Sequence, residues 1–278
     1  MRLNSKPSTY FLAILLCTMS FPVSGKATPD WKARNYERGI KPQPISFSER
    51  KVLRITRQWA KENNYFLRYA PRLGRVAHLI LAKNAPHSEL DSSKAKLFAH
   101  YWGMTDPEYA ISRLTLLPTD NLKESINRHL SQTFSNFPYN RVGLAISKEK
   151  KHSTLLMVFS RHSLRLTPTP SRVKVKSRIS LRGNFAPKKS LRAAQVVVSK
   201  PDGKIFKQKL KLKNKSFNHS IPTGNQPGVM DIQILVDRGS GPKLQRISQS
   251  ELDTRPGHHP FPQKELSPNS PINIPRSN

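Results

Sequence analysis

Apolar residues recur at helical spacing over the first half of the chain, from Ser46 to Phe134. Ser46 and Glu49 form a capping-box signature, so we expect a first helix to start there. The most apolar of these segments begins at Pro71, a residue that suits the first turn of a helix. Two more helices are expected, one from Ser92 or Ser93 to Trp102 with Gly103 as C-cap, and one from Thr119 or Asp120 to Phe134.

The periodicity changes after residue 140. Two segments rich in β-branched and apolar residues, 141–147 and 153–161, flank the charged stretch 148–152, which predicts a β-hairpin. Helices followed by strands indicate an α+β fold in which the helices cover a small antiparallel sheet. We expect this domain to span residues 46–166.

Strand signals alone follow the proline-rich linker 167–172. Short strands at this spacing predict an immunoglobulin-like β-sandwich over residues 173–247. From 248 to 278 the chain is rich in Pro, Ser, Asn and charged residues, so this tail is expected to be disordered. The strands are expected at 173–183, 194–199, 204–213, 216–221 and 229–237.

Residues 1–25 have the pattern of a secretory signal peptide. Arg2 and Lys6 precede the apolar run Tyr10–Met19, and small residues follow near position 25. That run is too short for a membrane span, and no later segment is more apolar. Cys17 is the only cysteine, so a mature chain would hold no disulfide or thiolate. We therefore expect a secreted bacterial protein, with the periplasm or the cell surface as the alternative.

The formal net charge of +31 favours binding to an anionic polymer. Lipopolysaccharide, teichoic acid and extracellular DNA all have the required charge. The densest basic run is 200–215, where lysines alternate with other residues. On one strand this alternation would put the lysines on a single exposed face and Leu210 and Leu212 toward the core. The expected anion-binding residues are Lys207, Lys209, Lys211, Lys213 and Lys215.

Two segments resemble the CAP superfamily, also called the SCP domain, a secreted α-β-α sandwich. They are PRLGRVAHLILAKN at 71–84 and FPYNRVGLAISKEKKHSTLLMVFS at 137–160. The layout is similar to divergent CAP-like proteins of myxobacterial type. In these a degenerate CAP-like unit precedes an LxPxP linker, here 166–170, and a β-domain with a PDG turn, here 201–203.

The resemblance implies a cleft lined in typical members by two His and two Glu, which in some members bind a metal. Ile80 stands where the first His is expected, and Glu62-Asn63 lies upstream of the matching helix. His129 falls close to the second His position. One histidine cannot hold zinc, which requires at least three protein ligands. We therefore expect a degenerate cleft without a metal or other cofactor.

No motif for a nucleophilic serine, a zinc protease or nucleotide binding occurs in the sequence. Among the other histidines, His78 and His100 are expected to have structural roles, whereas His87, His258 and His259 lie in exposed segments. The sequence favours a secreted, non-catalytic CAP-like protein that binds an anionic surface. Two alternatives stay open: a secreted hydrolase of cell-wall or protein substrates whose cleft includes His129, and sequence-independent binding of nucleic acid.

Overall fold

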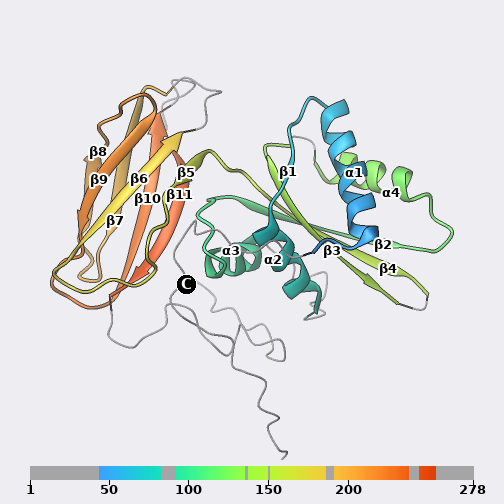
Figure 1. Ribbon diagram of the computed structural model, residues 1–278, viewed down its shortest axis with the longest axis horizontal. Helices are drawn as coiled ribbons and strands as arrows, with labels where there is room; N and C mark the ends of the chain where they lie inside the picture. The colour runs from blue at the N-terminus through green and yellow to red at the C-terminus, as the bar shows by residue number, and fades with distance from the viewer. Residues whose placement is uncertain are drawn as a thin grey trace, which may run out of the picture. The chain divides into compact units, whose positions relative to one another are not determined.

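The computed structural model describes residues 44–82, 92–134, 137–149, 151–185, 191–237 and 244–254. All of them belong to one compact unit, Ala33–Asn278. The expected signal peptide at 1–25 and residues 255–278 of the expected tail lie outside the described residues. The described part is a mixed α+β structure whose helices all lie in the first half of the chain (Figure 1). We call residues 44–163 the helical module and residues 164–254 the β-module.

Helices α1 (Phe47–Glu62) and α4 (Leu122–Thr133) are amphipathic and capped by side chains at their N-termini. Ser46 Oγ accepts a hydrogen bond from the Glu49 backbone at 3.2 Å, and Glu49 Oε2 accepts one from the Ser46 backbone at 2.8 Å. This capping box confirms the predicted start of α1. Asn121 caps α4, so that helix starts slightly later than expected.

Helices α2 (Pro71–Ala82) and α3 (Ser92–Tyr101) occupy the two remaining segments that the sequence predicts to be helical. Pro71 is the first residue of α2, where its missing N–H removes no helical hydrogen bond. Gly103 follows α3 with φ at 74°, a left-handed conformation that glycine adopts without steric cost. The predicted C-cap is therefore confirmed.

The helical module contains one four-stranded sheet with the order β1-β3-β4-β2. Strands β3 (Arg141–Lys148) and β4 (Ser153–Ser160) form the predicted antiparallel hairpin. Strand β2 (Tyr109–Leu116), which was not expected from the sequence, pairs antiparallel with the other edge of β4. The two-residue strand β1 (Arg68–Tyr69) pairs parallel with β3.

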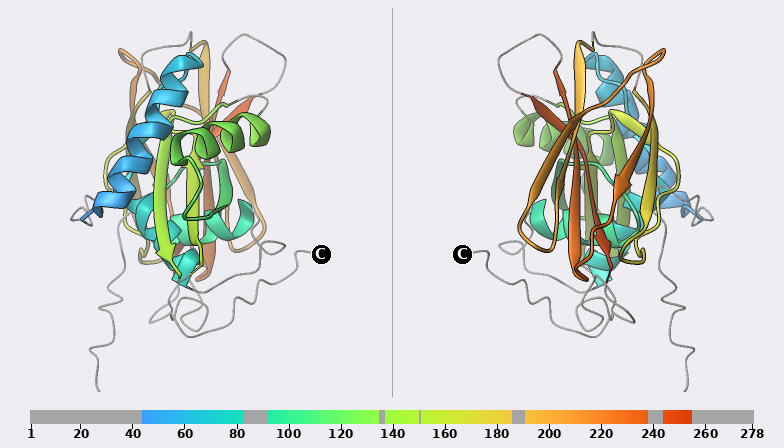
Figure 2. Two further views of the ribbon diagram at one scale, coloured as in Figure 1. Left: turned by 90° about the vertical axis from the view of Figure 1, so that its right-hand side faces the viewer. Right: turned by 90° about the vertical axis from the view of Figure 1, so that its left-hand side faces the viewer.

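Helices cover both faces of this sheet. One face packs on α1 and α4, whose apolar residues share a core with β3 and β4 (Figure 2, left). The opposite face packs on α2 and α3. Gly143 of β3 permits the close approach of α2, because a Cβ at this position would lie 2.0 Å from the carbonyl carbon of Leu73.

The β-module consists of two antiparallel sheets that share one apolar core (Figure 2, right). The first has the order β5-β6-β9, formed by β5 (Leu164–Leu166), β6 (Arg178–Phe185) and β9 (Ser216–Pro222). The second has the order β11-β10-β7-β8, formed by β7 (Ala193–Ser199), β8 (Ile205–Lys209), β10 (Val229–Asp237) and β11 (Gln245–Asp253). Alternating apolar residues of β7 and β10 fill the space between the sheets.

Two predicted boundaries are wrong. Strand β5 belongs to the β-module, because it pairs with β6 and buries Leu164 and Leu166 in the β-module core. The first module therefore ends before residue 164 rather than at 166. The strand expected at 173–183 starts only at Arg178, since Lys176 has a positive φ of 56° and donates its backbone N–H to the Gly224 carbonyl.

The tail was expected to be disordered from residue 248, and this start is wrong because strand β11 extends to Asp253. It pairs with β10 along its length, and Ser248 and Ser250 lie opposite Ile234 and Ile232. Both serines are only 2% exposed, so small polar residues occupy core positions there. The apolar alternation that marks a strand is thus absent from the sequence. Within the described residues, none of the helices is both long and apolar enough to cross a membrane.

Candidate anion-binding surface

His129, the histidine that the resemblance places nearest to a cleft, lies on α4 and contacts β2. Its Nε2 lies 2.6 Å from Oγ of Ser112. Ser112 is only 4% exposed, so its hydroxyl is not open to a substrate. The pair links α4 to the sheet beneath it. This partner was not foreseen from the sequence because β2 itself was not expected.

His78 and His100, which were expected to have structural roles, also contact neighbouring elements. His78 Nε2 of α2 lies 2.9 Å from Glu49 Oε1 of α1. His100 of α3 is buried and packs edge-on against Tyr109, with ring centroids 6.3 Å apart. His87, His258 and His259 lie outside the described residues. In the described part of the chain, no group of three or more His, Cys, Asp or Glu residues is placed to hold a metal ion.

Asp106 forms a buried polar cluster that was not foreseen from the sequence. Its carboxylate accepts hydrogen bonds from Ser160 Oγ at 2.6 Å and from His162 Nδ1 at 2.8 Å, and Arg141 Nη1 lies 3.3 Å away. Burial alone would raise the pKa of Asp106, but Arg141 and then His162 outweigh it and hold that pKa below its usual value. Asp106 is therefore a buried, paired anion.

This cluster closes one end of the sheet. Arg141 begins β3, Ser160 ends β4, and the two are register partners. Asp106, in the segment before β2, binds both of them and so fixes that segment to the sheet end. Asn140 holds the backbone of His162 with two hydrogen bonds of 2.7 and 2.8 Å. An isolated aspartate carries no sequence signal that would reveal these distant partners.

The predicted lysine row does not lie on a single strand. Strand β8 ends at Lys209; the next residue, Leu210, is buried in the core and donates its backbone N–H to the Ala194 carbonyl of β7 at 2.8 Å. The chain then crosses from one sheet to the other. Asn214 and Lys215 have φ values of 49° and 62°, typical of the tight turn of a two-residue hairpin.

The five lysines are therefore distributed around the β8 side of the β-module. Lys207 and Lys209 lie on β8, an edge strand of its sheet. Charged side chains on an edge strand prevent pairing with a second chain, which gives these two lysines a structural role. Lys211 and Lys213 lie in the crossing segment, and Lys215 lies in the turn. The expected alternation of exposed lysines with Leu210 in the core is present, but it follows a bent path.

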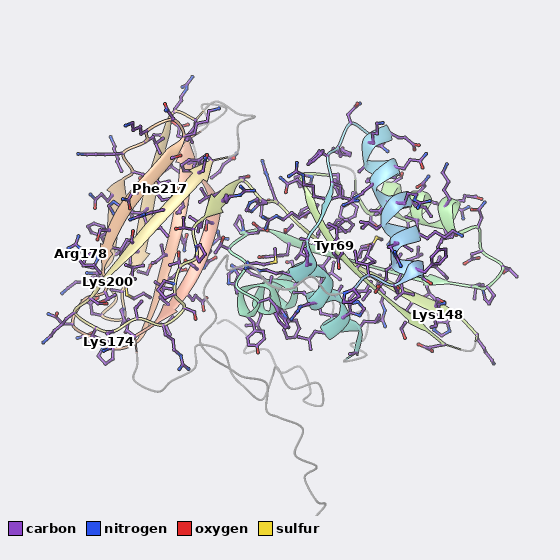
Figure 3. All side chains as sticks on the ribbon, in the orientation of Figure 1. Tyr69, Lys148, Lys174, Arg178, Lys200 and Phe217 are labelled. Atoms are coloured by element: carbon purple, nitrogen blue, oxygen red, sulfur yellow. The ribbon has the colours of Figure 1, made fainter. Side chains whose placement is uncertain are left out.

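The outer face of the sheet β5-β6-β9 carries a second basic surface that was not singled out from the sequence. Its side chains alternate with the core residues of these strands and are exposed. Arg178 is seen on this module, with Lys174 and Lys200 toward the same end (Figure 3). We call this surface the arginine face; it consists of Arg165, Arg178, Ser180, Arg182, Asn184, Asn218 and Ser220.

Hydrogen bonds between neighbouring side chains orient the arginine face. Arg178 Nε donates to Ser220 Oγ at 2.8 Å, and Arg182 Nε donates to Ser180 Oγ at 3.3 Å. Ser180 Oγ in turn donates to Asn218 Oδ1 at 3.3 Å. Because each of the two guanidinium groups is held through Nε, its two terminal nitrogens form the edge that binds carboxylate or phosphate in a bidentate manner.

The arginine face has an unbalanced positive charge. None of its seven residues is acidic, and none of the described carboxylates forms an ion pair with Arg178 or Arg182. The same charge acts on its surroundings: burial, and then the charge of Arg178, lowers the pKa of His219 on β9. This surface therefore offers fixed, uncompensated guanidinium groups to an anion.

No protein-family profile matches this sequence, and a comparison with curated proteins finds no match. Among solved structures, a cell-surface chitinase of Paenibacillus is 13% identical over 32% of this chain and 8% of its own, with a TM-score of 0.24. A lytic polysaccharide monooxygenase of Streptomyces lividans is 16% identical over 31% of this chain and 59% of its own, with a TM-score of 0.23. A β-1,2-glucanase of Parabacteroides distasonis is 8% identical over 39% and 18%, with a TM-score of 0.23. Similarities this weak carry no argument about this chain.

Proposed function

We propose that this protein is a secreted, non-catalytic binding protein that attaches to an anionic polymer of the cell envelope or the extracellular space. In this proposal the helical module is a degenerate CAP-like domain and the β-module is an immunoglobulin-like domain. The arginine face is the observation that carries the proposal, because it combines three exposed arginines with no carboxylate. The exposed lysines between 207 and 215 add to the positive field of the same module.

The spacing of the arginines suits an extended ligand better than a single small ion. Arg178 and Arg182 lie four residues apart on β6, which corresponds to about 13 Å along a strand. Serine and asparagine side chains lie between them and can donate or accept hydrogen bonds. A chain with repeated anionic groups can contact both guanidinium groups and the hydroxyl groups between them.

The composition of the arginine face also indicates how selective it is. It holds no aromatic residue that could stack on a base or a sugar ring. Binding therefore depends on charge, and lipopolysaccharide, teichoic acid and DNA are expected to compete for the surface. The buried position of Ser112 beside His129 gives no support to the alternative of a hydrolase that uses this histidine.

The test compares two double variants with the same loss of charge. Arg178→Gln with Arg182→Gln removes the arginine face, whereas Arg54→Gln with Arg57→Gln removes two exposed arginines of α1. Binding to immobilised heparin is measured as a function of salt concentration. We expect the first variant to flatten the log-log salt slope by about one for each arginine and the second to leave it nearly unchanged. Equal effects of the two variants would show that only net charge matters and would refute this site.

A further inference from the structure

A cavity of about 580 Å³ lies between α3, the segment before β2, and β11. A hydrogen bond of 2.7 Å from Lys96 Nζ to Gln249 Oε1 and one of 3.0 Å from the Gln249 backbone to the Thr105 carbonyl connect its walls. The lining is mixed: charged and hydroxyl groups lie beside Leu97, Pro107 and the rings of Tyr109 and Tyr139, so the cavity suits a ligand with both polar groups and an apolar ring face. The lining residues used below are Ser92, Lys96, His100, Glu108, Arg246 and Glu251.

Two cations share this cavity. Burial, and then the charge of Arg246, lowers the pKa of Lys96, so the two positive groups are close enough to repel each other. Glu108 and Glu251 also line the cavity, and burial and then the charge of Asp231 raise the pKa of Glu251. An anion bound beside Lys96 and Arg246 would relieve their repulsion.

His100 provides a second, independent observation. It lines the cavity, is only 4% exposed, and its Nε2 makes no hydrogen bond to any described residue. Burial, and then the charge of Lys96, lowers the pKa of His100 to about 3, so the ring is neutral at physiological pH. A buried polar atom without a partner is unfavourable, and a ligand hydroxyl group that reaches it would remove this cost.

We propose that this cavity is a binding site for a small hydroxylated anion, a sugar-sized ring that carries one carboxylate or phosphate group. The anionic group lies between Lys96 and Arg246, and hydroxyl groups face His100, Ser92 and Glu108. The volume falls within the range of small-molecule sites, about 300–1,000 Å³. This site is separate from the arginine face and does not depend on the function proposed above.

The experiment measures binding to the full chain by titration calorimetry with three probes. D-glucuronate carries a carboxylate, glucose 6-phosphate carries a phosphate, and glucose carries neither. We expect at least one of the two anions to bind at least ten-fold more tightly than glucose, and their order identifies the preferred anionic group. Equal binding of all three probes would overturn the proposal. The proposal would also be overturned if neither anion bound at about 10 mM. This concentration fills most of a site with a Kd of about 1 mM.

Variants assign the binding to this cavity. Arg246→Gln changes an exposed residue and should weaken binding of the preferred anion at least ten-fold, and Lys96→Met should do the same. Lys148→Gln, at the tip of the β3–β4 hairpin (Figure 3), is the control and should have no effect. Thermal unfolding shows whether each variant is folded. If Lys96→Met does not fold, the Arg246→Gln variant alone tests the site.

Unchanged affinity in a folded Arg246→Gln variant would refute the site. The heparin assay tests the arginine face separately.

Discussion

The two modules of this protein differ in the burial of their charged side chains. The helical module buries two carboxylates beside basic partners: Asp106 lies with Arg141 and His162, and Glu49 lies with His78. The described core of the β-module holds apolar residues and small hydroxyl groups, and most of its described arginines and lysines are exposed. Loss of a buried carboxylate should therefore cost stability in the helical module, whereas loss of an exposed basic residue of the β-module should alter binding and leave the fold intact.

Replacement of Asp106 is expected to have the largest effect. Asp106→Ala leaves Ser160, His162 and Arg141 without their shared carboxylate at a site that is nearly inaccessible to water. Loss of one partner from a buried ion pair destabilises a protein by about 3–5 kcal/mol. Urea denaturation followed by circular dichroism measures this change in the free energy of unfolding.

The control for Asp106 is an aspartate of the β-module. Asp202 lies in an exposed turn, and its side chain accepts a hydrogen bond from the Lys204 backbone and forms an ion pair with the Lys204 ammonium. Asp202→Ala should leave the denaturation midpoint almost unchanged. If the two aspartate variants shifted the midpoint equally, the contrast between the modules would be wrong.

Acid should destabilise the helical module through His100. Burial and the charge of Lys96 lower the pKa of His100 to about 3, whereas a histidine in an unfolded chain titrates near 6.5. As the pH falls below about 6.5, the unfolded chain binds a proton that the folded chain does not, so the free energy of unfolding decreases. Between pH 7 and pH 5 this residue should cost about 2 kcal/mol.

The difference between the wild type and His100→Gln isolates this contribution. The variant has no titrating group at this position, so its stability should fall less steeply between pH 7 and pH 5. Asp106 does not interfere in this range, because the stability that its lowered pKa provides is lost only as the pH falls through still more acidic values. Parallel pH profiles of the two proteins would show that the imidazole is not held neutral.

Much of the fold was predictable because it follows local rules. The capping box at Ser46, the glycine after α3 and the alternation of β10 each act within a few residues, and the structure has them as expected. Prediction from the sequence failed where a distant partner decides the outcome. The Asp106 cluster depends on residues 35 to 56 positions away. Strand β2 likewise pairs with the distant strand β4, and β11 fills core positions with serine.

The candidate site shows the same limit. The density of basic residues in the sequence predicted an anion-binding surface at the lysines of 207–215. The arginine face is assembled from β5, β6 and β9: its arginines come from β5 and β6, and Asn218 and Ser220 come from β9. Its arginines become a surface only through the register of the sheet, which the positions of single strands do not specify.

The smallest effect is expected from the edge lysines, and it separates two roles of basic charge in the β-module. Lys207→Gln with Lys209→Gln changes exposed residues, so the free energy of unfolding should stay within about 0.5 kcal/mol of the wild type. The heparin salt slope should flatten by less than in the arginine-face variant, because edge protection already explains these two lysines.

Without them β8 presents an uncharged edge, so sedimentation should reveal self-association at high protein concentration. Lys211→Gln with Lys213→Gln removes the same charge outside the strand and should not promote association. A slope change as large as that of the arginine variant, without association, would make the lysine row the main binding surface.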